Sequence, residues 1–312
     1  MVSIITTYID EHDFLEEAVK SALAQVGIEM ELIVVCNAPK IASDYNPLPE
    51  YKSAFKFIHE PTPGSAYARN AGLHAATGEW IQFLDVDDLI IPGKIANQLS
   101  HAKRSAIVSP HIFRMINGST QFSKWMPEDI WCGMLNSGLG STSSMLWHRE
   151  SLIQIGGWST TYNSHQEYEL LFRLTAAGHH IECVGLRETI VRERLSGSIT
   201  LQSQPIRAKE GIQLRETIWQ HLVQRGLVTS SRKNAFLQYI FRQLRGLYRL
   251  DRDEAMTIYK RYFSHESFKP EQIGIPFYRL MHKSLGFNLT EKIFTKYSAA
   301  RDKYLPFLPV NR

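Results

Sequence analysis

The feature that most constrains the fold is an alternation of short apolar segments with longer amphipathic ones over the first 90 residues. The short segments are rich in β-branched and aromatic residues and are bounded by polar ones, which predicts buried strands. The predicted strands are VSIITTY (2–8), ELIVVC (31–36), FKFIHE (55–60) and EWIQFL (79–84). Residues 12–26 and 65–77 have helical periodicity. Apolar strands alternating with helices indicate an α/β fold, with a mixed, largely parallel sheet covered by helices.

Beyond Pro92 the pattern is looser, and the chain changes character after Pro205. We expect strands in 105–116, 141–150, 180–185 and 188–194, a short helix in 149–157 and a longer one in 164–178. From Pro205 onward the chain is helical in pattern, basic and aromatic. SGSITLQSQP (196–205) is the best boundary candidate, which predicts an α/β domain at 1–204 and a helical C-terminal region at 205–312.

Charge divides the chain at the same place. Residues 1–204 carry 15 Lys and Arg against 22 Asp and Glu, a net charge of −7. Residues 205–312 carry 20 against 9, a net charge of +11. Such an asymmetry suggests that the two parts meet different partners.

Cysteine content and hydropathy predict the compartment. The three cysteines, Cys36, Cys132 and Cys183, are widely spaced and odd in number, and the opening MVSIITTYID lacks the features of a secretory signal. No window approaches the roughly 18 consecutive apolar residues of a membrane span. We therefore expect a cytoplasmic protein, either free or peripheral at the inner face of the membrane, with its cysteines reduced and serving as small core residues.

Three carboxylates stand at the end of one predicted strand. EWIQFL runs directly into Asp85, Asp87 and Asp88. Like charges this close repel one another, so a positive partner is expected. In parallel sheets, ligands bind beyond the carboxyl ends of the strands, where these residues fall. The alternative is that Asp87 or Asp88 caps a helix entered at Pro92.

Four stretches together resemble family 2 glycosyltransferases, which have the nucleotide-sugar-binding fold called GT-A. They are VSIITTYIDEHDFLEEAVKSALAQ, PGSAYARNAGLHAATGEWIQFLDVDD, SHQEYELLFRL and RERLSGSIT, in the order and spacing of that family. By this resemblance Asp85 and Asp87 form the Asp-x-Asp motif that holds Mn²⁺ or Mg²⁺. Asp87 is the expected direct ligand, and Asp85 would face the ribose or a metal-bound water. Two carboxylates suffice, because these ions also take water and substrate phosphate as ligands.

The resemblance also implies nucleotide-sugar-binding residues. Thr7, Tyr8 and Asp10 match the nucleotide-facing loop after the first strand. Gly64 and Arg69 match the family's Gly-x-x-x-Ala-Arg-Asn run, and Arg69 is a candidate to meet phosphate.

Asn37 stands where the family has an aspartate that meets the base. Its amide offers both an acceptor and donors for a base edge. The alternative is an ordinary polar turn residue before Pro39.

Glu167 is the expected general base. The family's Glu-Asp pair becomes Gln166-Glu167 here, and glutamate reaches about one methylene further than aspartate. The alternative is a Ser164-x-x-Glu167 capping box, which needs no catalysis. Glu169 is expected to pair with Arg173 one helical turn later.

Arg192 and Arg194 lie in a loop where the family often has a histidine that binds the metal. No histidine stands in RERLSGS, so the arginines are candidates to neutralise the diphosphate. The alternative is a surface strand of alternating charge.

The basic region offers a possible contact with a membrane. Residues 231–250 predict a helix with a broad apolar face and arginines on another face, which could lie on an anionic bilayer near a lipid-linked acceptor. The alternative is that this face packs on the catalytic domain and the arginines face solvent. No module typical of nucleic-acid binding is recognisable, so no nucleic-acid partner is expected.

Taken together, these features predict an inverting, metal-dependent transferase. It would move one sugar from a nucleotide diphosphate donor, expected to be a UDP-sugar, to a hydroxyl of a growing glycan or lipid-linked glycan. The processive members' Gln-x-x-Arg-Trp signature is absent, which favours single-sugar transfer. Two alternatives stay open: a binding or scaffold protein that keeps the fold without the chemistry, and a sugar nucleotidyltransferase. The second normally has a Gly-rich basic loop after the first strand, where TTYIDEHD is acidic.

Overall fold

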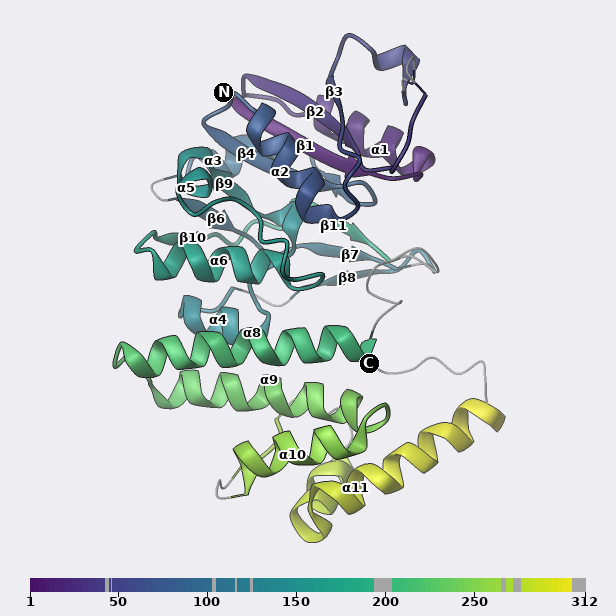
Figure 1. Ribbon diagram of the computed structural model, residues 1–312, viewed down its shortest axis with the longest axis vertical. Helices are drawn as coiled ribbons and strands as arrows, with labels where there is room; N and C mark the ends of the chain where they lie inside the picture. The colour runs from purple at the N-terminus through teal and green to yellow at the C-terminus, as the bar shows by residue number, and fades with distance from the viewer. Residues whose placement is uncertain are drawn as a thin grey trace. The chain divides into compact units, whose positions relative to one another are not determined.

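The chain forms two compact units, Met1–Gln202 and Ser203–Arg312 (Figure 1). The computed structural model describes the chain except residues 43, 44, 46, 103, 104, 116, 124, 125, 194–203, 265–267, 272–275 and 305–312. Within the described part, no helix has the length and apolar character needed to cross a membrane. The assignment of separate functional roles to 1–204 and 205–312 stays a prediction.

The N-terminal unit is built on two sheets. Its strands are β1 (Val2–Tyr8), β2 (Met30–Cys36), β3 (Lys56–His59), β4 (Trp80–Asp85), β5 (Leu89–Ile90), β6 (Ala106–Val108), β7 (Ile112–Arg114), β8 (Thr120–Phe122), β9 (Leu146–His148), β10 (Ile181–Cys183) and β11 (Thr189–Arg192). Its helices are α1 (His12–Leu23), α2 (Ser65–Ala75), α3 (Lys94–Leu99), α4 (Ile130–Asn136), α5 (Arg149–Gln154) and α6 (Gln166–Ala176), with 3-10 turns η1 (Pro49–Tyr51) and η2 (Thr142–Ser144).

The larger sheet has the strand order β10-β6-β9-β4-β1-β2-β3. Every neighbouring pair is parallel except those made by β9, which runs antiparallel to β4 and β6. The smaller sheet has the order β5-β11-β7-β8. The predicted α/β fold with a largely parallel sheet is confirmed.

Helices cover both faces of the larger sheet. Ile4 and Ile5 are adjacent in β1, so their side chains point to opposite faces. Ile4 belongs to the core cluster that includes Leu15 of α1 and Ile95 of α3. Gly72 of α2 lies against Ile5 so closely that an added Cβ would come within 2.4 Å of its side chain. Helices α1 and α2 therefore pack on opposite faces.

The parallel register aligns the carboxyl ends of three central strands. Tyr8 at the end of β1 is paired with Cys36 at the end of β2, and Thr7 with Asp85 at the end of β4. Loops that follow these strands therefore leave the sheet at one edge, which is where ligands bind in parallel sheets.

Two expectations about the middle of the chain were wrong in detail. The described residues of 105–115 form two strands in different sheets, β6 and β7, because Pro110 between them has no backbone N–H to donate to a ladder. The first part of 141–150 forms η2, and only Leu146–His148 is strand. Helix α4, capped by the Asp129 carboxylate, was not predicted.

The C-terminal unit is helical, as expected. It contains α8 (Gln204–Gln224), α9 (Ser230–Tyr248), α10 (Arg252–Phe263) and α11 (Pro276–Tyr304). The apolar side chains of α9 are buried, among them Phe236, Ile240, Phe241, Leu244 and Leu247. The ring of Phe241 contacts the aromatic rings of Phe263, Phe268, Tyr278, His282 and Phe287. The expectation that the apolar face of 231–250 contacts a membrane was therefore wrong, because this face forms the core of its own unit.

Candidate active site

The side chain of Glu11 holds the backbone of the loop after β1. The Glu11 carboxylate accepts hydrogen bonds from the backbone N–H groups of Ile9 (2.9 Å) and Asp10 (3.3 Å). Thr7 is partly exposed and Asp10 is exposed, so both side chains are open to a ligand. Tyr8 is buried, and its hydroxyl bonds that of Tyr45 at 3.0 Å. Of the three residues predicted to face the nucleotide, Tyr8 therefore has its side chain in the core, whereas Thr7 and Asp10 do not.

The aspartates after β4 form a tight turn. The backbone N–H of Asp88 donates to the carbonyl of Asp85 at 2.9 Å. Asp85 and Asp87 are partly exposed, whereas Asp88 is buried. Burial, followed by the nearby charges of Asp85 and Asp87, raises the pKa of Asp88 well above its usual range. Helix α3 has Gly93 as its N-cap, so the alternative that Asp87 or Asp88 caps it is wrong.

Ser143 of η2 supports this turn from inside the protein. Its hydroxyl accepts a hydrogen bond from the backbone N–H of Asp85 at 3.0 Å. Its carbonyl accepts from Gln82 Nε2 (2.9 Å) and Lys94 Nζ (3.2 Å). Burial lowers the pKa of Lys94 to about 7. Sequence reasoning missed Ser143 and Lys94, because neither belongs to a motif and only the fold brings them beneath β4.

Arg69 of α2 joins the turn to the start of α6. Its Nη2 lies 2.7 Å from Asp85 Oδ1, and its Nη1 donates to Gln166 Oε1 at 2.8 Å. Ser65 also donates to Gln166 Oε1, at 2.9 Å. The guanidinium of Arg69 therefore bridges Asp85, the first aspartate of the Asp-x-Asp motif, and Gln166, the residue before Glu167.

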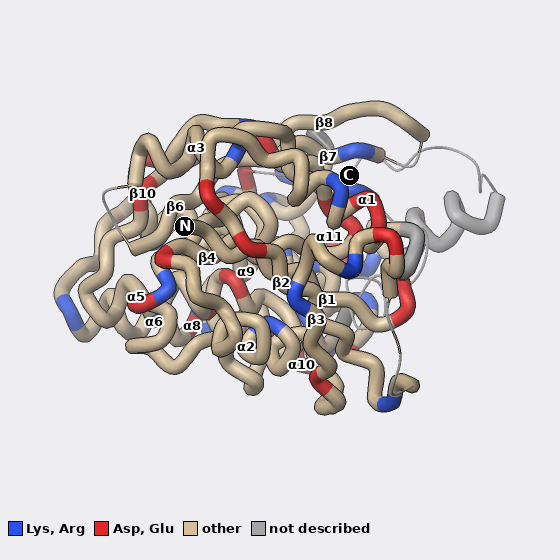
Figure 2. The backbone as a smooth tube through the Cα atoms, turned by 90° about the horizontal axis from the view of Figure 1, so that it is seen from above, with Lys and Arg blue, Asp and Glu red and all other residues tan. Residues whose placement is uncertain are grey.

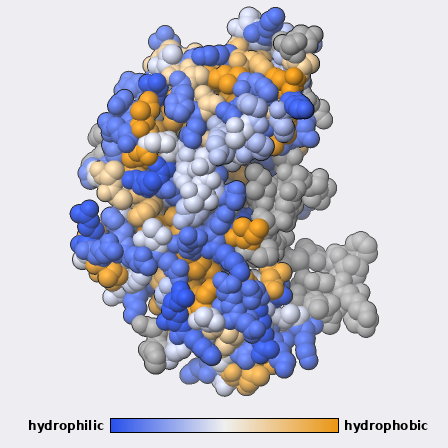
Figure 3. All heavy atoms as spheres, viewed as in Figure 1, coloured by the Kyte–Doolittle hydropathy of each residue, from blue (hydrophilic) through white to orange (hydrophobic). Residues whose placement is uncertain are grey.

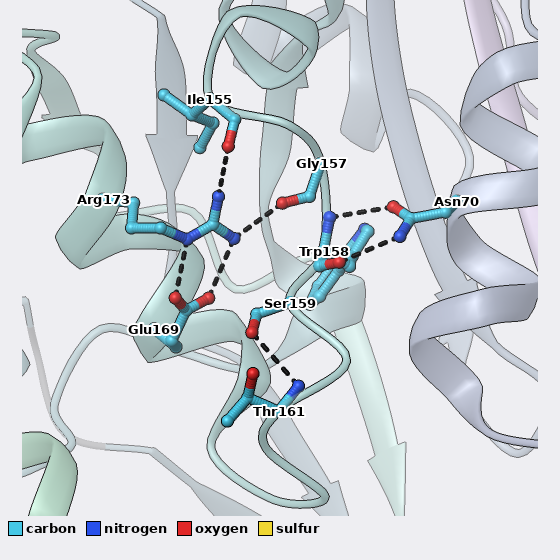
Figure 4. Close-up of polar contacts among 8 residues, drawn as sticks. All are labelled: Asn70, Ile155, Gly157, Trp158, Ser159, Thr161, Glu169 and Arg173. Atoms are coloured by element: carbon cyan, nitrogen blue, oxygen red, sulfur yellow. Dashed lines mark hydrogen bonds and ion pairs between the residues drawn. The ribbon is translucent and has the colours of Figure 1, made fainter.

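An indole ring and a side-chain amide fix the position of that guanidinium. Arg69 lies over the ring of the buried Trp158, 4.6 Å from its centroid. Asn70 holds the backbone of Trp158 with two hydrogen bonds, of 2.8 and 2.9 Å (Figure 4). Gly157 has φ +69°, and a Cβ there would lie 2.6 Å from Asn70 Oδ1, so glycine is required for this approach.

Helix α6 carries Glu167 in its first turn, where the helix dipole favours a negative charge. The N-cap is His165, with φ +57° and no side-chain capping bond. The N-cap lies one residue later than a capping box of Ser164 and Glu167 requires, and that alternative stays a prediction.

The predicted pair of Glu169 and Arg173 is confirmed, with Nε 2.6 Å from Oε1. Arg173 also donates to the carbonyls of Ile155 and Gly157, each at 2.6 Å (Figure 4). This pair therefore anchors the loop that leads to Trp158.

Asn37 uses its amide on the neighbouring loop. Its Nδ2 donates to the carbonyls of Glu60 (2.8 Å) and Thr62 (2.7 Å), and its Oδ1 accepts from the backbone N–H of Gly64 (2.9 Å). Both donors are occupied, which leaves one acceptor position on Oδ1. Asn37 holds Gly64, another predicted site residue, at the start of α2. Contact of either residue with a nucleotide stays a prediction.

Arg192, at the end of β11, ties the aspartate turn to α1. Its guanidinium bonds the carbonyl of Asp87 and the carboxylate of Glu17, and lies 4.8 Å from the ring centroid of Phe14. Figure 2 shows acidic residues along this part of α1. Arg192 is thus placed beside the turn, and a contact with diphosphate stays a prediction. Arg194 lies outside the described residues.

The donor atoms at the turn suit a hard divalent cation. Asp85 Oδ1 is engaged by Arg69. The assignment of Asp87 as the direct ligand stays a prediction. Within the described residues, no group of three or more His, Cys, Asp or Glu could hold a metal ion. A site at Asp85 and Asp87 therefore needs water and phosphate oxygens to complete it, as Mg²⁺ sites commonly do.

Known proteins resemble this chain in both sequence and fold. The model of the family described as glycosyl transferase family 2 matches residues 3–164. An uncharacterized glycosyltransferase of Haemophilus influenzae is 26% identical over 185 residues, which cover 56% of this chain and 62% of that protein. The succinoglycan biosynthesis protein ExoO of Rhizobium meliloti is 31% identical over 103 residues, 32% of this chain and 29% of that protein. The chain thus matches less than two thirds of these relatives' length.

Solved structures share the architecture. S. aureus TarS 1-349 aligns with a TM-score of 0.56 at 14% identity, covering 80% of this chain and 73% of that one. The mannosyltransferase PcManGT from Pyrobaculum calidifontis aligns with a TM-score of 0.53 at 16% identity, covering 98% and 81%. At these identities the likeness is one of fold, the GT-A fold. Together with the family match over more than half of its length, this means that the chain belongs to glycosyl transferase family 2.

Proposed function

We propose that this protein is an inverting, metal-dependent glycosyltransferase that moves a single sugar from a nucleotide diphosphate sugar, a UDP-sugar, to a hydroxyl of a growing glycan. The observation that carries the proposal is the bridge of Arg69 between Asp85 and Gln166. It brings the expected metal-binding turn next to the expected base, Glu167, at the carboxyl edge of the sheet.

Other glycosyltransferase structures support the choice of donor. TarS 1-349 was solved with UDP-GlcNAc and with UDP, and PcManGT with GDP-Man and Mn²⁺. The name of ExoO refers to succinoglycan biosynthesis, which supports a polysaccharide as the acceptor class.

Each residue has a distinct task in this proposal. Glu167 accepts the proton of the acceptor hydroxyl as its oxygen attacks the anomeric carbon opposite the diphosphate. Asp87 and Asp85 would hold the cation, which when bound would supply Lewis-acid stabilisation of the departing diphosphate. Arg69 orients the carboxylate of Asp85, and Arg192 holds the turn through the carbonyl of Asp87.

Calorimetric titration with UDP, GDP, dTDP and CMP, each with and without Mn²⁺, tests the proposal. We expect one nucleotide to bind, at least about tenfold more tightly with Mn²⁺, and Asp87→Asn to abolish the gain. Glu79→Gln is the matched control, because Glu79 is an exposed carboxylate just before β4, at the end opposite the aspartate turn. Binding unchanged in Asp87→Asn would refute the metal site. A folded wild type that binds none of the nucleotides would favour the scaffold alternative.

A further inference from the structure

Helix α11 is interrupted at the non-helical Gly286, and each of its two segments has a buried side and an exposed side. The buried sides include Tyr278, Phe287 and Glu291. The exposed sides are apolar, and on Figure 3 apolar patches lie among hydrophilic residues over the C-terminal helices. Their large apolar side chains, 45–70% exposed, are Phe277, Leu280, Leu289, Ile293 and Tyr297.

The spacing of these residues makes a stripe. Leu289, Ile293 and Tyr297 are each four residues apart, so they lie on one side of the helix. Phe277 and Leu280 are three apart and form a similar pair before the non-helical Gly286. Large exposed apolar patches on a soluble surface mark contact with a protein or a membrane.

Basic side chains flank this stripe. Arg279, Lys283, Lys292 and Lys296 are all exposed. Among the α11 side chains that the structure describes, Glu291 is the acidic one, and it is buried and paired with Arg245 at 2.9 Å. The exposed face is therefore positive as well as apolar, in keeping with the net charge of +11 over 205–312.

We propose that the exposed face of α11 after Gly286, defined by Leu289, Ile293 and Tyr297, lies on the surface of an anionic phospholipid bilayer. A helix with large apolar residues beside lysines binds in the interfacial plane, where the apolar side chains enter the acyl boundary and the lysines meet acidic headgroups. A second copy of the same face is disfavoured, because a two-fold contact would bring the lysines of both copies together. This contact replaces the one expected for α9 and does not depend on the catalytic proposal.

The test is co-sedimentation of the full-length protein with phosphatidylcholine vesicles with and without phosphatidylglycerol. We expect binding to the anionic vesicles that weakens as salt is added. The double variant Leu289→Ser/Ile293→Ser should lower the partition coefficient at least about tenfold, because two exposed anchors are lost. The double variant Lys292→Gln/Lys296→Gln should lower the partition coefficient about tenfold on anionic vesicles and leave that on phosphatidylcholine vesicles unchanged.

The matched control is Val223→Ser/Val228→Ser, which alters two apolar residues of the same unit that are 54% and 42% exposed but lie off α11. It should bind vesicles as the wild type does. Circular dichroism establishes that each variant is folded. Three results would each overturn the proposal: no vesicle binding by the wild type, equal loss in the control variant, or a dimer in light scattering that the Leu289→Ser/Ile293→Ser variant abolishes.

Discussion

Both units pair an arginine with a carboxylate, but the two pairs have different surroundings. Asp85, bound by Arg69, keeps 32% of its side chain exposed at the edge of the sheet. Glu291, bound by Arg245, is fully buried among aromatic rings and also accepts a hydrogen bond from the Tyr278 hydroxyl. The first pair is open toward solvent, and the second is closed.

This difference in exposure predicts different roles for the two pairs, one in ligand binding and the other in stability. A buried pair contributes mainly through what happens when one partner is removed, because the other is left as an uncompensated charge. A pair at an exposed edge retains acceptor positions that a ligand can use. We therefore expect changes at the edge of the sheet to alter binding and turnover, and changes inside the C-terminal unit to alter the free energy of unfolding.

The largest effect is expected at Glu167. Glu167→Gln removes the base while keeping the size of the side chain, so kcat should fall about 10³- to 10⁴-fold with nucleotide affinity little changed. Steady-state kinetics and calorimetry measure the two quantities. Glu169→Gln is the informative neighbour: it weakens the pair with Arg173, so it should lower stability more than kcat. Equal kcat in Glu167→Gln and wild type would exclude Glu167 as the base.

The next largest effect is expected in the C-terminal unit. Glu291→Leu leaves Arg245 without its buried partner and should lower the free energy of unfolding by about 3–5 kcal/mol, measured by urea denaturation. Nucleotide affinity should stay the same. The double variant Arg245→Met/Glu291→Leu should recover much of the loss. A double variant no more stable than Glu291→Leu would contradict this account.

A smaller effect is expected at the bridge. Arg69→Lys keeps the charge but cannot reach Asp85 and Gln166 with a rigid fork, so metal-dependent nucleotide affinity should fall about tenfold, or about 1.4 kcal/mol. Arg225→Lys, at an exposed arginine of the other unit, is the control. A double-mutant cycle with Gln166→Ala should show coupling between the two residues. Purely additive losses would count against the bridge.

The last effect, of about the same size as that at the bridge, concerns pH. The pKa of Lys94 falls from 10.5 to about 7 on folding, so between these values the unfolded chain binds one proton more. This group therefore adds stability as pH rises above 7 and contributes a constant below it. The difference in unfolding free energy between wild type and Lys94→Met should grow by about 1–2 kcal/mol from pH 7 to pH 8.5. A difference independent of pH would mean that Lys94 does not titrate in this range.

Sequence patterns located most elements of the N-terminal unit. β1 was predicted with its exact bounds, and β2, β3 and β4 within a residue or two, because a run of apolar residues bounded by polar ones is visible locally. Sequence patterns did not predict helix α4 or the division of 105–116 into two strands, because short elements contain too few turns or alternations for a periodic signal. The carboxylates after EWIQFL also indicated the position of the Asp85–Asp88 turn, and the stretch SHQEYELLFRL indicated the first turn of α6.

The sequence by itself therefore determined the alternation of strands and helices, the acidic turn after β4 and the charge contrast between the two parts. Only the tertiary structure decided what each polar group meets: Arg69 between Asp85 and Gln166, Asn37 on the loop at Gly64, and Ser143 beneath the turn. It likewise buried the apolar face of α9 and left that of α11 exposed. Local patterns specify which face of an element is apolar, whereas its partner depends on contacts between residues far apart in the chain, for which a single sequence carries no periodic signal.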